Sequence, residues 1–245
     1  MLACSWSGGK DCCLAYWKAL SSGKEIGYLL NTFRKESGRV AFHGVRAELV
    51  REQADSLGVR LLQKEVFGDG YEEQFLEALL ELKAEHVSGV VFGDIDVREN
   101  RQWSENVCRK AGLDSYFPLW DLDQKGILSS FIGIGFKAVV VAVDERSLNE
   151  GDLGRQLDWD WLDHIETLNS SSRSPPITYC GENGEYHTFV YDGPPFRYPI
   201  GFRPGVKVHR DGHWLIDLEP IQRDFQSDIP ERPCMEVRPE KREWI

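Results

Sequence analysis

The strongest constraint on the fold is a regular alternation, over the first 145 residues, between short apolar runs and segments with helical spacing. Short apolar runs bounded by glycine or polar residues are typical of buried strands, and apolar side chains every three or four residues indicate helices. Strands that alternate with helices of ten or more residues form parallel βαβ units. We therefore expect an α/β fold with a doubly wound, mainly parallel, Rossmann-like sheet. The expected strands span 2–6, 26–33, 59–66, 87–92 and 138–143, and the expected helices span 10–20, 45–57, 71–82 and 99–111.

The pattern changes beyond residue 144, which predicts a second, smaller unit. We expect a helix over 158–168 and a β-hairpin that turns at Asp211-Gly212. From 220 to 245, 11 of 26 residues are charged and four are proline, which favours an extended tail. The predicted division is a sheet domain over 1–145, a C-terminal lobe over 146–219 and the tail over 220–245.

Composition narrows the classes of function. The chain carries 40 acidic and 29 basic side chains, for a formal net charge of −11, which disfavours broad binding to nucleic acid or anionic lipid. The six cysteines form no CxxC pair, so we expect neither a disulfide framework nor a zinc knuckle. The N-terminus lacks the features of a signal peptide, and the longest apolar run is too short to cross a membrane. We expect a cytoplasmic protein that binds neither nucleic acid nor membrane.

The most informative stretch is residues 4–12, CSWSGGKDC, at the junction of the first expected strand and helix. Glycines at such a junction let a ligand approach the backbone, and the first turn of the helix presents unpaired N–H groups and the positive end of the helix dipole. A site of this kind favours an anion, most often phosphate. The spacing matches neither a Walker A loop nor a dinucleotide fingerprint.

This stretch resembles the Ser-Gly-Gly-x-Asp-Ser signature of the PP-loop ATP pyrophosphatases. Ser7, Gly8, Gly9 and Asp11 match it, and Cys12 stands where the signature has its last serine. In that family the loop binds the β- and γ-phosphates of ATP, which is cleaved between the α- and β-phosphates. The departure at Cys12 removes one strong hydroxyl donor.

Two charged residues of the loop are candidates for chemistry. Lys10 adds a cation for the phosphates, and Asp11 can orient the loop or hold Mg²⁺. The alternative for both is an exposed first turn of a helix, where the dipole already favours an aspartate.

A second stretch, residues 180–194 (CGENGEYHTFVYDGP), narrows the family. It is similar to the Glu-Gly-Gly-Glu-(Phe/Tyr)-Glu-Thr stretch of the diphthine–ammonia ligase family, with Asn183 in place of its first glycine and His187 in place of its third acidic residue. Gly93-Asp94 and Arg101 also occur in the order expected for that family. The resemblance covers roughly residues 1–196.

The resemblance implies a HUP-type nucleotide-binding sheet with a smaller lobe that closes over the ligand. It implies that ATP activates a carboxylate as an acyl-adenylate and that ammonia then displaces AMP to form an amide. The acceptor is diphthine on a translation factor or a small carboxylate metabolite. We expect the nucleotide at the carboxyl ends of the strands, with binding residues Ser7, Gly8, Gly9, Lys10, Asp11, Cys12, Asn31, Thr32, His43, Gly93, Asp94 and Arg101.

Glu182, Glu185 and His187 are candidates to position the acceptor or ammonia, or to accept a proton from ammonium. With Lys10 and Asp11 they complete the predicted catalytic set. The alternative is a polar loop with solvated carboxylates.

Two other functions fit the same motifs. One is a PP-loop ATP pyrophosphatase that modifies tRNA or another small acceptor, although the net charge of −11 and the lack of a basic cluster speak against tRNA. The other is a nucleotide-binding sensor without turnover, which the departures at Cys12 and His187 suggest.

Overall fold

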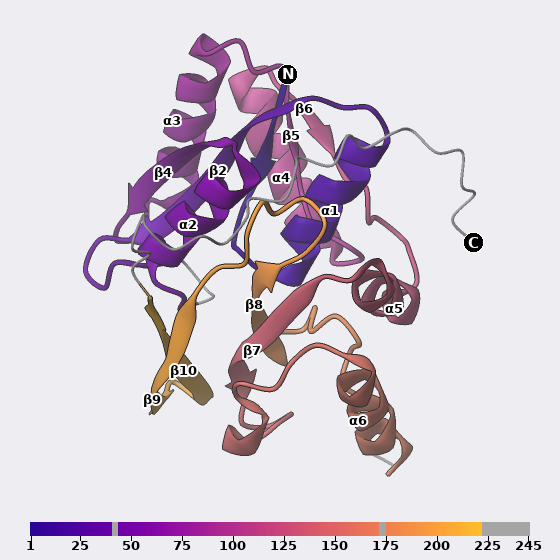
Figure 1. The fold of residues 1–245 in the computed structure, drawn as a ribbon. Helices are drawn as coiled ribbons and strands as arrows, with labels where there is room; N and C mark the ends of the chain where they lie inside the picture. Colours follow the sequence, from indigo (N-terminus) through magenta and orange to yellow (C-terminus); the bar gives the residue numbers. More distant parts are fainter. Residues whose placement is uncertain (41–43, 172–174, 222–245) are drawn as a thin grey trace.

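The computed structural model describes residues 1–40, 44–171 and 175–221. The predicted nucleotide contact His43 and nearly all of the predicted tail lie outside these residues. Within them the chain forms two sheets, a mainly parallel one and an antiparallel one (Figure 1).

Four of the five strands predicted for the parallel sheet lie in the first sheet, as β1, β2, β4 and β5. Strands β2, β1, β5 and β6 are neighbours in that order, and β4 pairs with β2, all in parallel. A short antiparallel strand, β3, pairs with the end of β2. The bounds are β1 (Leu2–Ser5), β2 (Ile26–Arg34), β3 (Arg39–Val40), β4 (Arg60–Val66), β5 (Gly89–Val91) and β6 (Asp114–Tyr116).

Helices cover both faces of this sheet, as a doubly wound fold requires. Helices α1 (Lys10–Ser21) and α2 (Ala47–Leu57) pack into one hydrophobic cluster, and α3 (Tyr71–Ala84) and α4 (Arg98–Ala111) pack into another. Both α2 and α4 end at a glycine with positive φ, Gly58 at 67° and Gly112 at 65°, which is the usual way to end a helix. The sequence prediction of the α/β fold is confirmed.

The second sheet is antiparallel, with strand order β8-β7-β10-β9. Its hairpin turns at Asp211 and Gly212, both with positive φ, as predicted from the Asp-Gly pair. The bounds of this region are α5 (Gln124–Ile134), β7 (Lys137–Asp144), the 3₁₀ turn η1 (Glu150–Asp152), α6 (Trp159–Ser170), β8 (Tyr186–Asp192), β9 (Phe202–Arg210) and β10 (His213–Pro220).

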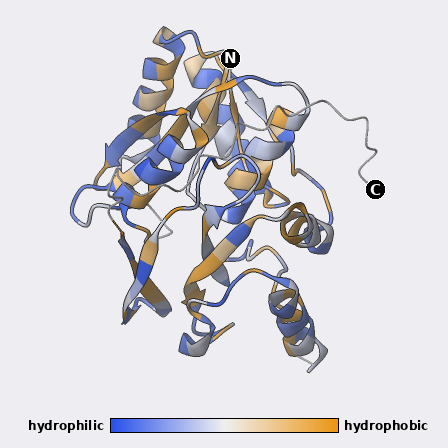
Figure 2. Cartoon of the chain, viewed as in Figure 1, coloured by the Kyte–Doolittle hydropathy of each residue, from blue (hydrophilic) through white to orange (hydrophobic). Residues whose placement is uncertain are grey.

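One strand was assigned to the wrong sheet. The expectation that the apolar run 138–143 continues the parallel sheet is wrong, because β7 pairs antiparallel with β8 and β10. Residues 138–144 are all buried, and Figure 2 shows the strand as hydrophobic along most of its length. A continuous apolar run predicts burial on both faces, but it does not say which strands lie beside it.

The two sheets are held together by a shared core and by backbone contacts. One hydrophobic cluster contains residues of α1 and α2 together with residues of β7, β8 and α6. The Val190 N–H of β8 donates to the Gly8 carbonyl at 2.9 Å, and the Arg197 N–H donates to the Ser56 carbonyl at 2.9 Å. β8 therefore runs directly beside the start of α1 (Figure 1). No helix in the described part of the chain is long and apolar enough to span a bilayer.

Candidate active site

The loop between β1 and α1 has the backbone of an anion-binding turn. Gly8 has φ of 83°, a left-handed conformation that glycine adopts without strain. Gly9 is the N-cap of α1 and offers no side chain to cap the first turn. The Lys10 N–H instead donates to Thr188 Oγ1 of β8 at 3.1 Å. The first turn of α1 thus begins at the contact between the two sheets.

Lys10 is buried at this contact, with only 4% of the side chain exposed. Its ammonium donates to Asp11 Oδ2 at 2.8 Å and to the Cys180 carbonyl, and it lies 5.0 Å from the centre of the Tyr186 ring. Burial acts to lower the pKa of Lys10, but Asp11, Tyr186 and Cys180 together outweigh it, and the pKa is raised above its ordinary value. Lys10 therefore places a permanent positive charge at the start of α1.

Asp11 has one carboxylate oxygen in use and one free. Oδ2 pairs with Lys10, whereas the buried Oδ1 has no hydrogen-bond partner among the described residues. An unpaired buried carboxylate oxygen is costly unless a ligand satisfies it. The described residues contain no group of three or more His, Cys, Asp or Glu side chains that could hold a metal alone.

Cys12 occupies the serine position of the signature and is buried. The Ser7 hydroxyl donates to Cys12 Sγ at 3.5 Å, and the Cys12 thiol donates to the Gly9 carbonyl at 3.2 Å. Burial raises the pKa of the Cys12 thiol. The side chain is therefore a neutral, weak donor that braces the loop.

The backbone just after β5, at Gly93, lies too close to the backbone of α1 to leave room for a side chain. A Cβ on Gly93 would lie 2.8 Å from both the carbonyl carbon of Asp11 and the amide nitrogen of Cys12. The next residue, Asp94, accepts a hydrogen bond from Ser104 Oγ at 3.2 Å. Burial raises the pKa of Asp94 to about 6, although the bond from Ser104 opposes the shift.

The 180–187 loop separates the three candidates that sequence analysis grouped. Glu185 accepts from the Thr178 N–H and hydroxyl, both at 2.8 Å, and from the Asn183 N–H at 3.0 Å. It fastens the loop and does not line the cavity described next. Glu182 and His187 do line that cavity.

The carboxyl of Glu182 is perturbed by its surroundings. Burial, helped by the carboxylates of Asp11, Asp96 and Asp94 and opposed by Lys10, raises its pKa to about 8. At neutral pH most of the Glu182 side chains are therefore protonated, and the ionised form, which can act as a base, becomes dominant above about pH 8.

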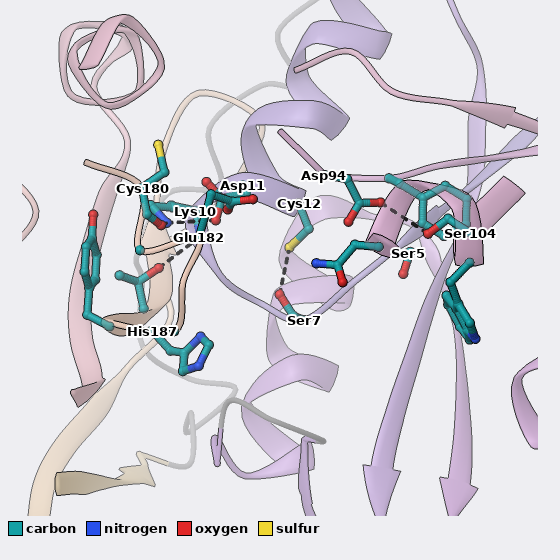
Figure 3. Close-up of a pocket in the computed structure, with 18 of the residues that line it drawn as sticks. Ser5, Ser7, Lys10, Asp11, Cys12, Asp94, Ser104, Cys180, Glu182 and His187 are labelled. Carbon is teal, nitrogen blue, oxygen red and sulfur yellow. Dashed lines mark hydrogen bonds and ion pairs between the residues drawn. The ribbon is translucent and has the colours of Figure 1, made fainter. Parts of the chain in front are cut away.

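These residues surround one cavity of about 610 Å³ at the carboxyl ends of β1 and β5 (Figure 3). Loop 7–12 and the 180–188 segment form one side, where Lys10, Asp11, Cys180 and Glu182 are grouped. Aromatic side chains of α3 and α4 form the other side, where Tyr71 and Trp103 have ring centres 5.6 Å apart. The cavity thus joins a charged end to an aromatic end, as in many ligand sites.

Several predicted nucleotide contacts lie behind the cavity wall. Asn31 donates to the Trp6 carbonyl at 2.8 Å and is fully buried. Thr32 lies 3.3 Å from the Tyr71 hydroxyl, so it contacts a lining residue without lining the cavity itself. Arg101 pairs with Glu105 and stacks over aromatic rings, also outside the cavity. Of the predicted set, Ser7, Lys10, Asp11, Cys12, Gly93, Asp94, Glu182 and His187 line it.

The sequence carries no signal for the aromatic end of the cavity. Tyr71, Phe75 and Trp103 sit on amphipathic helices, where aromatic residues are usual core components. Ser104 was missed because a lone hydroxyl in a helix carries no motif, and Thr188, which matches the last residue of the second stretch, was given no role. Their spacing gave no signal, since the cavity is assembled from elements far apart in the sequence.

The sequence is similar to known proteins over both sheets. Residues 1–115 match the family model of the diphthamide synthase N-terminal domain, and residues 123–219 match that of the diphthamide synthase C-terminal domain. A diphthine–ammonia ligase of Danio rerio is 31% identical over 215 residues, which cover 79% of this chain and 83% of that protein. The Homo sapiens protein of that name is 28% identical over 218 residues, 79% of each chain.

A third relative is longer. The Schizosaccharomyces pombe diphthine–ammonia ligase is 29% identical over 213 residues, and the match covers 34% of its length, so the chain corresponds to about a third of it. The second matched region begins before β7, in agreement with the place of that strand in the antiparallel sheet. Since the matches extend over both sheets and over the loops that form the cavity, the chain belongs to the diphthine–ammonia ligase family.

Proposed function

We propose that this chain is an ATP-dependent, AMP-forming ligase that converts an acceptor carboxylate into an amide with ammonia. The observation that carries the proposal is the cavity in which Lys10, at the glycine-capped start of α1, and the buried acid Glu182 both lie. Membership of the family supports the same reaction, and it does not favour tRNA modification or a sensor without turnover.

The phosphates of ATP fit the charged end of the cavity. Backbone N–H groups at the start of α1 and the Lys10 ammonium stabilise negative charge as the bond between the α- and β-phosphates breaks. The base then extends toward Tyr71 and Trp103, whose rings supply an apolar surface. Asp94 lies between Cys12 and Ser104 in Figure 3, and we expect it to contact the sugar.

The residues also fit a magnesium ion bound together with the phosphates. Mg²⁺ in nucleotide sites takes one or two protein carboxylates and completes its shell with phosphate oxygens and water. The free Asp11 Oδ1 is such a ligand. When bound, the ion adds positive charge at the phosphates.

Glu182 is the residue best placed to prepare ammonia. In its ionised form it accepts a proton from ammonium and leaves neutral ammonia beside the acyl-adenylate. The nitrogen lone pair attacks the acyl carbon, the carbon–oxygen bond to AMP breaks, and a second proton leaves as the amide forms. His187 lines the same region and can carry that proton away.

The relatives are named for diphthine, and we propose a diphthine-bearing protein as the acceptor. The test supplies the purified chain with ATP, Mg²⁺, an ammonium salt and the acceptor, and separates the nucleotide products. We expect AMP and pyrophosphate in equal amounts, dependent on both acceptor and ammonium. Formation of ADP and phosphate would contradict the proposal. If the same products form with a small carboxylate and none form with diphthine, the proposed reaction stands and only the proposed acceptor is wrong.

A further inference from the structure

Gln53, a residue of α2 that does not line the cavity, lies directly behind the phosphate loop. Its side chain is fully buried and makes three hydrogen bonds. Oε1 accepts from Trp6 Nε1 at 2.8 Å, and Nε2 donates to the Gly8 carbonyl at 3.1 Å and to the Val190 carbonyl at 2.6 Å. One amide thus joins the chain just before the loop, the loop itself and β8.

The bond to Gly8 fixes the orientation of the peptide that links Gly8 to Gly9. In a trans peptide the carbonyl and the following N–H point in opposite directions. The Gly8 carbonyl is held toward Gln53 and the Val190 N–H, so the Gly9 N–H points the other way. The Gly9 N–H donates to Ser7 Oγ at 3.4 Å, and Ser7 lines the cavity. A contact this long leaves the N–H available to a stronger acceptor.

The space behind the loop is also filled by this side chain. A Cβ on Gly8 would lie 2.9 Å from Gln53 Oε1, so residue 8 is limited both by its positive φ and by the position of the amide. The position of the Gln53 amide therefore requires a glycine at residue 8, and the bond to the Gly8 carbonyl in turn holds the amide in place.

We propose that Gln53 is a positioning residue for the nucleotide, which holds the Gly8–Gly9 peptide so that the Gly9 N–H faces the phosphates and which ties that orientation to β8. The proposal rests on the proposed use of ATP. Because β8 carries His187 and Thr188, the same amide links the phosphate loop to residues of the reacting end of the cavity.

The test compares three substitutions by calorimetric titration with ATP and with adenosine. Gln53→Met removes all three hydrogen bonds at similar length, and we expect the Kd for ATP to rise about tenfold or more, as loss of one useful phosphate contact predicts. Gln53→Glu, with a buried carboxyl that stays protonated, keeps one donor and gives an intermediate loss. The affinity for adenosine stays unchanged in both, since no phosphate is present.

Ser56→Ala is the matched control on the same helix. Ser56 bonds to the carbonyl and N–H of Tyr198 at 2.5 and 3.1 Å, so it also fastens α2 to the C-terminal region but does not touch the loop. We expect it to lower the Tm and leave the Kd for ATP unchanged. Equal Kd values for ATP in wild type and both folded Gln53 variants would overturn the inference, as would an equal loss for adenosine. A wild-type chain that binds no ATP would instead overturn the proposed function.

Discussion

Replacement of Lys10 by methionine separates two roles that the structure gives this side chain. Its ammonium pairs with Asp11 at 2.8 Å and donates to the Cys180 carbonyl, so it joins α1 to the C-terminal region. An ammonium has three N–H donors, of which these two bonds use two, and we expect the third to bond a phosphate oxygen. Lys10→Met keeps the length of the side chain and removes the charge.

The expected magnitudes follow from burial. Removing one partner of a buried ion pair costs about 3–5 kcal/mol. Lys10 is 4% exposed but Asp11 is 24% exposed, so solvent relieves part of the loss, and we expect the free energy of unfolding to fall by about 2–3 kcal/mol. Loss of a charge-assisted bond to phosphate, about 1.5–3 kcal/mol, raises the Kd for ATP roughly 10- to 100-fold.

Urea unfolding and calorimetric titration with ATP measure the two effects on the same samples. The double variant Lys10→Met/Asp11→Asn removes the uncompensated carboxylate, so it should recover part of the lost stability and still bind ATP weakly. The reasoning is refuted if folded Lys10→Met binds ATP as wild type does, because the ammonium would then serve only to hold the two sheets together.

Three further substitutions test other parts of the site. Glu182→Gln should abolish the pH dependence that the Glu182 carboxyl gives to amide formation. With a pKa of about 8, the ratio of the wild-type rate to the variant rate should rise about tenfold from about pH 7 to about pH 9. A ratio that does not change with pH contradicts the role of Glu182 as a base. Because the pKa of Glu182 rises from 4.5 to about 8 on folding, the wild type loses stability as pH rises through that window, and its Tm should fall relative to that of the variant between these two values. Gly93→Ala pushes a methyl group into the backbone of α1 and should lower the free energy of unfolding by about 1–3 kcal/mol in urea titrations. The control Gly133→Ala, whose methyl group meets open space on α5, should change the free energy of unfolding by less than about 1 kcal/mol. Equal effects of the two substitutions would contradict the close packing of Gly93 against α1. Glu185→Gln turns one of the two accepting oxygens into a donor, so at least one bond from Thr178 or Asn183 is lost and amide hydrogen exchange across the 180–187 loop should be faster. Unchanged exchange would show that Glu185 does not fasten this loop.

Much of the fold could be predicted because its signals are local. The alternation of apolar runs and helical spacing defined the parallel sheet, and Asp211-Gly212 located the hairpin turn. The strand β7 was placed in the wrong sheet because its partners, β8 and β10, lie tens of residues away in sequence. Burial is encoded in the run itself, but strand pairing is decided by tertiary packing.

The site could be predicted in part for the same reason. Loop 7–12 was found because strand, glycines and helix start are contiguous. The segment that contains Glu182, which lines the cavity, also suggested Glu185, which does not, since two nearby carboxylates look alike until their hydrogen bonds are known. Gln53 gave no signal, because a single glutamine on an amphipathic helix is usually a surface residue.

The central claim is that the acceptor carboxylate attacks the α-phosphate of ATP, and isotope transfer tests it most directly. The acceptor is labelled with ¹⁸O in its carboxylate and incubated with the chain, ATP, Mg²⁺ and ammonium, and the nucleotide product is weighed by mass spectrometry. Adenylation predicts AMP that carries one ¹⁸O atom for each amide formed. Unlabelled AMP, or labelled phosphate formed together with ADP, would contradict the account.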